Sequence, residues 1–126
     1  MDYELNIPYT PPSLNIWHHL HWAQRLRFQR EWTEAIWALC NEPRVPPMDK
    51  VHLSATIYFK ENRRRDHDNF ESTLKKMAQD ALVKIGIISD DTSAYVEWGA
   101  INLSVDKHNP RTELVMVSVA GTGHSA

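Results

Sequence analysis

Alternation of apolar and polar residues is clearest in the segment Val51–Phe59, where every second side chain is apolar. This pattern predicts a β-strand with one face in the core and the other toward solvent. Such half-buried strands are typical of an antiparallel or mixed sheet covered on one side. Weaker alternation predicts a first strand at 3–8, ended by proline, and two later strands at about 94–105 and 112–120. The residues 108–110 between these two strands are predicted to form a hairpin loop.

Two other segments show the three- and four-residue spacing of an amphipathic helix. The first covers residues 21–40. The second is predicted to begin at Asp68 or Asn69, either of which can cap a helix, and to run to about Ile85, where Gly86 stops it. Its apolar stripe consists of Phe70, Leu74, Met77, Ala78, Ala81, Leu82 and Ile85. Together these elements predict an α+β fold, with two main helices packed on a small mixed or antiparallel sheet of about four strands.

Composition indicates one domain and excludes several classes of protein. A chain of 126 residues, 42% of them apolar, is long enough for one core but not for two. We assign residues 3–120 to this domain and 121–126 to a frayed tail. The single cysteine, Cys40, excludes an internal disulfide framework and is expected to be a buried small hydrophobe. No apolar run approaches the roughly 20 residues that cross a bilayer, and the first residues are not a signal peptide, so we expect a cytoplasmic protein with no membrane partner.

The most informative residues surround the start of the second predicted helix. Asp66 and Asp68 follow directly on three arginines, and Asp90 and Asp91 come after the helix ends. In extended chain, residues i and i+2 point to the same side, so the first two carboxylates could bind one ion while His67 points away. Gathered carboxylates repel one another, so a fold rarely collects them without a cation. Oxygen ligands favour Mg²⁺, with Mn²⁺ as a substitute.

Basic residues beside these carboxylates indicate a phosphodiester substrate. Arginine binds phosphate through paired hydrogen bonds. The candidate DNA contacts are Lys60, Arg63, Arg64 and Arg65, because they adjoin the acidic residues. The net charge of −2 provides no global basic field, so local patches and bound cations would have to attract nucleic acid. The structural alternative is that the aspartates only cap the helix or solvate a turn, and that the arginines line a solvated loop.

Three motifs, taken together, resemble the RusA family of Holliday-junction resolvases, small metal-dependent endonucleases common in prophages. Residues 8–15 (PYTPPSLN) are similar to the family's proline-rich segment near the amino end. Residues 63–69 (RRRDHDN) resemble its arginine run leading into Asp-x-Asp-Asn, and residues 80–91 (DALVKIGIISDD) resemble its Asp-Ala-Leu, glycine and Asp-Asp ending. The order of motifs and elements agrees across most of the chain.

This resemblance implies a Mg²⁺-dependent endonuclease, bacterial or phage-encoded, that resolves four-way DNA junctions by symmetric paired nicks and works as a homodimer. The implied metal ligands are Asp66, Asp68 and Asp91, with Asp90 as the alternative for the third position. Asn69 matches the family's asparagine, and we expect it to support the loop.

The implied catalytic lysine is less directly placed by the motifs. Some family members have it one turn beyond the Asp-x-Asp, where this chain has Ser72. Counting back from the downstream motif aligns Lys76 with it, and Lys75 is the alternative, because helix geometry alone leaves both open. Two other functions also remain open: a branched-DNA binder on the same fold that does not cut, and another metal-dependent phosphodiesterase, such as an RNase or a nucleotide hydrolase.

The tryptophans offer a second set of candidates. Trp22 and Trp32 fall on the stripe of the first helix, so we expect them in the core or in a dimer interface, whereas Trp17 or Trp37 could stack on bases.

Overall fold

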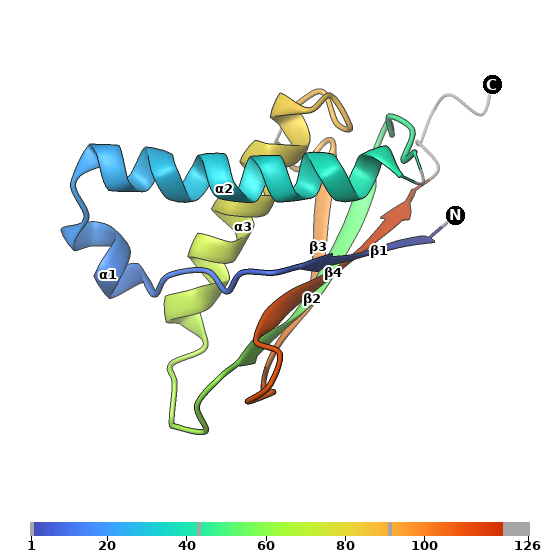
Figure 1. Ribbon diagram of the computed structural model, residues 1–126. Coiled ribbons are helices and arrows are strands. Elements are labelled where there is room, and N and C mark those ends of the chain that lie inside the picture. The colour runs from blue at the N-terminus through green and yellow to red at the C-terminus, as the bar shows by residue number, and fades with distance from the viewer. Residues whose placement is uncertain (1, 43, 91, 120–126) are drawn as a thin grey trace.

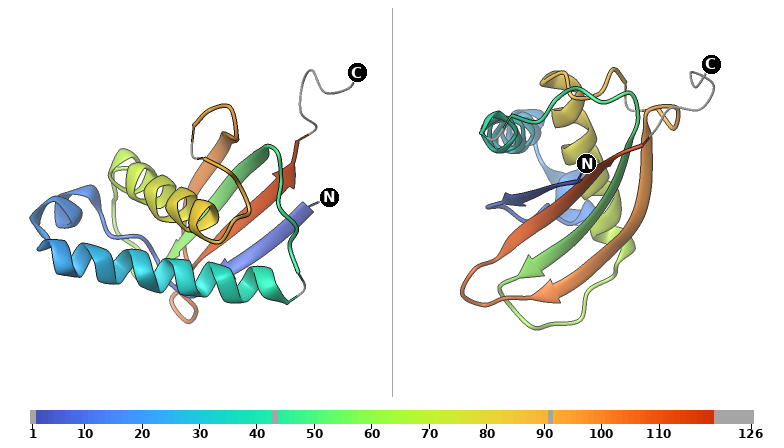
Figure 2. Two further views of the ribbon diagram at one scale, coloured as in Figure 1. Left: turned by 90° about the horizontal axis from the view of Figure 1, so that it is seen from above. Right: turned by 90° about the vertical axis from the view of Figure 1, so that its right-hand side faces the viewer.

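The computed structural model describes residues 2–42, 44–90 and 92–119. Its elements, in chain order, are β1 (Asp2–Ile7), α1 (Leu14–His19), α2 (Trp22–Asn41), β2 (Val51–Phe59), α3 (Asp68–Lys84), β3 (Val96–Val105) and β4 (Arg111–Ser118). The strands form one mixed sheet in the order β1-β4-β2-β3. The long helices α2 and α3 lie over one face of this sheet (Figures 1 and 2). The predicted α+β fold is confirmed.

Strand β2 is the best-predicted element and has a neighbour on each side. It pairs parallel with β3 and antiparallel with β4. Its odd-numbered residues are buried and its even-numbered residues are half-buried, as the alternation in the sequence predicts. The buried face packs against the apolar stripe of α3, which holds Leu74, Met77, Ala78, Ala81 and Leu82.

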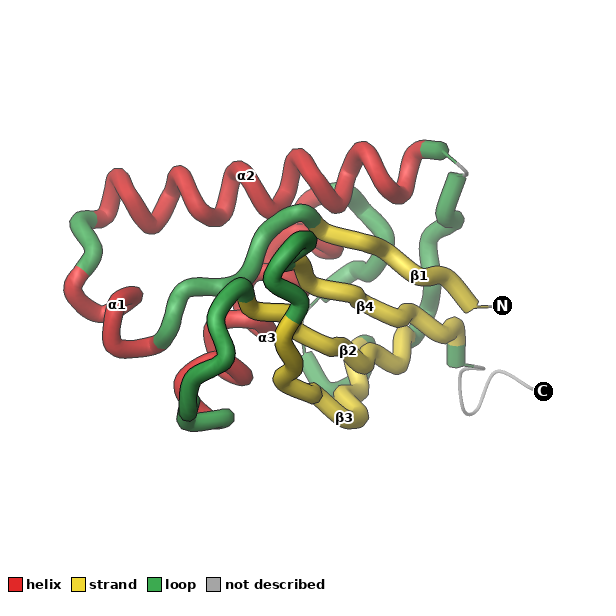
Figure 3. Tube along the Cα trace, turned by 60° about the horizontal axis from the view of Figure 1, so that its bottom comes forward, coloured by secondary structure: helices red, strands yellow, loops and turns green. Residues whose placement is uncertain are grey.

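The hairpin predicted at residues 108–110 is wrong, because β3 and β4 are not neighbours. Strand β2 lies between them (Figure 3). Helix α3 connects β2 to β3 as a crossover, and a crossover of this kind returns the next strand parallel to the first. The loop after β3 then passes the end of β2, where the N–H of Asp106 donates to the Phe59 carbonyl, 2.8 Å away. Strand β4 therefore takes the other side of β2.

Helix α2 begins within two residues of its predicted start but packs on the domain only along part of its length. Its buried residues are Trp32, Ile36 and Cys40, all in the second half. The first half extends past the sheet toward α1 (Figure 1), so Trp22 is exposed rather than in the core. Cys40 is buried as predicted, and burial raises the pKa of its thiol to about 11.

The short helix α1 was not predicted. Ser13 caps it by accepting a hydrogen bond from the backbone N–H of Ile16, 3.2 Å away. Its buried residue is Trp17, and the Arg25 guanidinium of α2 lies 5.4 Å above the Trp17 ring. This burial removes Trp17 as a base-stacking candidate, whereas Trp37 is exposed.

Two buried threonines hold the proline-rich segment that joins β1 to α1. The Thr112 hydroxyl donates to the Tyr9 carbonyl at 2.8 Å, and the Thr73 hydroxyl donates to the Pro12 carbonyl at 2.7 Å. They are the buried polar side chains of the described part of the chain. Because Thr112 belongs to β4 and Thr73 to α3, the proline-rich segment is tied both to the sheet and to the helices above it.

In the ranges that the structure describes, no helix has the length and apolar character needed to cross a membrane. The predicted tail, 121–126, lies outside these ranges.

Candidate functional site

The loop that follows β2 carries the predicted DNA contacts, and its arginines have different environments. Lys60, Arg63 and Arg64 are exposed. Arg65 is half-buried, its guanidinium lies 3.9 Å above the Phe59 ring, and Nη1 donates to the backbone carbonyls of residues 61 and 63 at 2.8 and 3.2 Å. Partial desolvation, followed by the charge of Arg63, lowers the pKa of Arg65, although nearby Glu61 opposes this shift. Arg65 therefore organises the loop, and the other three are available to phosphate.

The backbone at the start of α3 is helical rather than extended. His67 is the N-cap residue, with φ −54° and ψ −44°, and its side chain makes no capping bond. The predicted caps, Asp68 and Asn69, are instead the first residues of the helix. The Asp66 carboxylate accepts a hydrogen bond from the backbone N–H of Asp68 at 3.1 Å. The expectation of an extended Asp-x-Asp with His67 pointing away is therefore wrong.

His67 lies among the acidic residues. Its Nε2 contacts the backbone carbonyl of Ile101 on β3. Because a carbonyl can only accept, the hydrogen of the ring belongs on Nε2 in this contact. Its Nδ1 lies 3.3 Å from Oε2 of Glu71. The ring is thus oriented by a backbone partner, the arrangement common for histidines that bind metals.

Three side chains at this helix start can share a cation. Ligand atoms of His67, Asp68 and Glu71 all lie within 4.8 Å of one another. Residues 67, 68 and 71 fall on one side of a helix because they are spaced by three and four. Two carboxylates and one imidazole fit a divalent cation, with Mn²⁺ suited by the nitrogen ligand and Mg²⁺ by the oxygens. Neither Glu71 nor His67 was predicted from the sequence as a ligand, although helix spacing places both beside Asp68.

The two candidate lysines point to different partners. Lys75 Nζ lies 2.8 Å from Oε1 of Glu71, so it reaches the group of candidate cation ligands. This hydrogen bond is the main reason that the pKa of Glu71 is lowered, with a smaller contribution from His67. Lys76 Nζ instead lies 3.6 Å from Oδ2 of Asp80, one turn farther along. The structure therefore brings Lys75, and not Lys76, to the group of candidate cation ligands.

The second acidic segment lies at the other end of α3. Asp91 falls outside the described residues, and Asp90 is exposed. The segment before β3 is tied to the start of β2 through the bonds Met48 N–H to Ile87 carbonyl and Val51 N–H to Tyr95 carbonyl. Asp66, in contrast, follows the end of β2. A nine-residue strand spans roughly 26 Å, and a 17-residue helix about 25 Å.

Figure 1 shows the same separation, with the loop before α3 and the loop after it at opposite ends of the helix. Asp90 and the Asp66–Asp68 pair therefore do not converge within one copy of the chain.

No family model matches this sequence, and no curated protein is similar enough to it to be counted as a relative.

Proposed function

We propose that this protein is a divalent-metal-dependent endonuclease that resolves four-way DNA junctions by paired nicks. One observation carries the proposal: a group of cation ligands at the start of α3 directly follows a loop that exposes Arg63 and Arg64. A cation site beside arginines suits a phosphodiester, because both neutralise phosphate charge. The motifs that resemble RusA resolvases support the same reaction and the branched substrate.

The ligands of the cation would be Asp68, His67 and Glu71, with Asp66 adjacent. When bound, Mg²⁺ or Mn²⁺ supplies an activated water and offsets the charge that develops on the phosphate. Lys75 is held beside this group by its ion pair with Glu71. Its ammonium adds positive charge where the transition state becomes more negative.

We propose a homodimer because the two acidic segments lie far apart within one copy of the chain. If the segment that carries Asp90 belongs to the same metal centre as Asp68, a second copy of the chain must provide it. A two-fold dimer can place each such segment at the start of the other copy's α3, and it also presents two equivalent sites to two strands of like polarity.

Mixed dimers test this arrangement directly. Asp68→Asn and a double variant, Asp90→Asn with Asp91→Asn, are expected to be inactive alone. If the centre is shared between copies, a mixed dimer has one site with every native carboxylate, and it nicks one strand. If each copy builds its own centre, both sites of the mixed dimer are damaged and no nick appears.

The experiment that tests the function is cleavage of a mobile synthetic four-way junction, with linear duplex and single strands as controls, in Mg²⁺ or EDTA. Metal-dependent paired nicks confined to the junction are expected. Tight junction binding without a nick in Mg²⁺ or Mn²⁺ would identify a non-cutting binder. Cleavage of RNA or nucleotides with no preference for branched DNA would identify another phosphodiesterase.

A further inference from the structure

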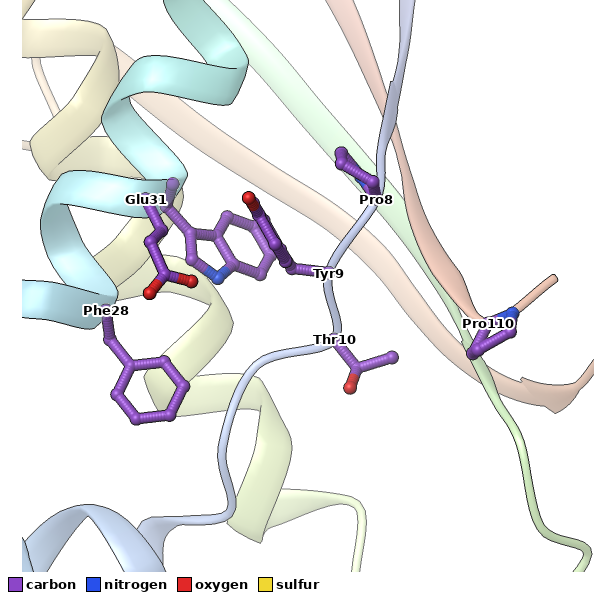
Figure 4. Close-up of a pocket in the computed structure, with 7 residues that line it drawn as sticks. Pro8, Tyr9, Thr10, Phe28, Glu31 and Pro110 are labelled. Atoms are coloured by element: carbon purple, nitrogen blue, oxygen red, sulfur yellow. The ribbon is translucent and has the colours of Figure 1, made fainter.

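A groove runs along the proline-rich segment beside the arginine loop. Its first cavity has a volume of about 320 Å³ and is lined in part by Pro12, Ile16, Phe28, Phe59, Arg63 and Phe70. A second cavity, of about 270 Å³, shares Thr10 and Phe28 with the first. Figure 4 shows Phe28 of α2 and Thr10 of the proline-rich segment at the sides of this second cavity. We call the two cavities together the proline groove.

The wall of the proline groove is fixed by the fold itself. The buried hydroxyls of Thr112 and Thr73 hold the carbonyls of Tyr9 and Pro12. Because the segment between these carbonyls is tied to β4 and to α3, it keeps its position without a ligand. Binding sites for small groups are usually formed in advance in this way.

Aromatic rings and two arginines, Arg63 and Arg65, line the first cavity. Phe28 and Phe70 are half-buried, so each ring keeps some accessible surface. The Phe70 ring is held edge-on to Phe59, with centroids 4.8 Å apart. Arg63 is exposed at the rim, whereas Arg65 is engaged by the loop backbone. Aromatic surface beside an exposed cation is the combination that binds single-stranded nucleic acid, by base stacking and phosphate contact.

The second cavity adds hydrogen-bonding groups. Trp32 is 1% exposed and lines this cavity, and its Nε1 has no acceptor among the described residues. The Glu31 carboxylate lies at the same cavity (Figure 4). A nucleobase edge carries donors that a carboxylate can accept, whereas the Trp32 N–H is buried beneath the surface of this cavity.

We propose that the proline groove binds unpaired nucleotides of branched DNA, with a base against Phe28 and Phe70 and a neighbouring phosphate on Arg63. This inference rests on the proposed function, because the branch point is where a junction offers unstacked bases. Phe70 follows Asp68 by two residues on α3. The groove and the candidate metal centre therefore both lie at the start of α3.

Abasic scanning of the junction tests the base contact. The dissociation constant is measured in EDTA, with one base removed at a time around the branch, for the native protein and for Phe28→Leu. At one or two positions, base removal is expected to weaken native binding about 5- to 30-fold. Phe28→Leu should weaken binding of the intact junction and remove most of that abasic penalty. Equal penalties in both proteins at every position would overturn the inference.

A pair of adjacent arginines provides a test that leaves the core untouched. Arg63 and Arg64 are both exposed, but only Arg63 lines the groove. Arg63→Gln and Arg64→Gln each remove one charge, so both should flatten the salt dependence of binding. Only Arg63→Gln is expected to change the abasic penalty at the same positions as Phe28→Leu. Identical penalties for the two arginine variants would exclude the groove as the strand's path.

The outcomes separate this inference from the proposed function. If the protein nicks the junction in Mg²⁺ but no variant changes the abasic penalty, the groove does not bind DNA, and the proposed endonuclease activity is unaffected. If the variants change the abasic penalty but the protein does not nick the junction, the groove is a DNA-binding site and the proposed endonuclease activity is wrong.

Discussion

At its start, helix α3 holds charged side chains at the surface, and at its end the chain turns inward and packs. His67, Asp68 and Glu71 are at least partly exposed and face one another. At the other end, Gly86 makes a left-handed turn with φ +83°, and Ile87 and Ile88 are buried. The two ends of one helix therefore have different roles, charge at the start and a buried turn at the end. We expect changes of the charged side chains at the start to affect chemistry, and changes in the turn at Gly86, Ile87 and Ile88 to affect stability.

The largest effect is expected from Asp68→Asn, which removes the ligand charge at the start of α3. Junction cleavage should fall below detection while junction binding stays the same or improves, because one negative charge near the phosphates is lost. The measurement is a single-turnover cleavage assay beside a binding titration. Asp2→Asn, an exposed change on β1, is the control and should cut normally. Cleavage that survives Asp68→Asn would remove this carboxylate from the mechanism.

The two neighbouring lysines sharpen the comparison within the same helix. Lys75→Gln should reduce the cleavage rate by about 100-fold, because its ammonium is held beside Glu71. Lys76→Gln removes the same charge one residue along, from the ion pair with Asp80, and should reduce the rate only slightly. Rates of the two variants are compared at saturating junction and metal. The reverse order would restore the alignment-based choice of Lys76.

Gly86→Ala tests the far end of the helix. Alanine at a left-handed backbone angle is strained, so the free energy of unfolding should fall by about 1–2 kcal/mol. Among the described residues, no heavy atom outside Gly86 and its two chain neighbours lies within 4 Å of the position that a Cβ would take, so the loss comes from the backbone conformation. Denaturant unfolding measures the loss, and cleavage per folded molecule should be preserved. A loss of cleavage without a loss of stability would contradict the division between the two ends.

The smallest effect concerns pH and the ion pair between Glu71 and Lys75. Because the folded pKa of Glu71 is lowered chiefly by the bond to Lys75, the pair stabilises the fold above the ordinary pKa of glutamate, about 4.3. That stabilisation is lost as the pH falls through the pKa of Glu71 in the folded protein, which is lower than its ordinary pKa. For a partly exposed pair it amounts to about 0.3–0.5 kcal/mol. Glu71→Gln should therefore be less stable than the native protein at pH 7 and equal to it in strong acid.

Local patterns in the sequence predicted most of the helices and strands. The order of the strands in the sheet was not predictable, because it depends on pairing between distant parts of the chain. The alternation in β2 and the stripe of α3 identify both elements, because burial imposes these periods directly. The loop at residues 108–110 looks like a hairpin, but only the crossover through α3 decides that β2 separates β3 from β4. The exposure of the first half of α2 was not predicted either, because apolar residues such as Trp22 continue the helical spacing past the edge of the sheet.

The candidate site was predictable in part. Asp68 and the arginine run stand out by spacing and charge. Glu71 was missed because the helix was placed to begin at Asp68 or Asn69, with Asp66–Asp68 treated as extended chain. Lys75 and Lys76 differ by one residue of helix rotation, and only their observed partners, Glu71 and Asp80, distinguish them.

The pairing of β1 with β4 also has a consequence for how the chain folds. Asp2 lies opposite Val117 in this ladder, so the first strand finds its partner only after almost the whole chain is available. Strand β4 also lies between β1 and β2 in the sheet. A chain that ends before β4 therefore cannot pair β1 with the rest of the sheet. Such long-range contacts slow folding, because the ends must meet before the contacts form. The sheet is therefore expected to assemble after synthesis of β4, with β1 waiting unpaired until then.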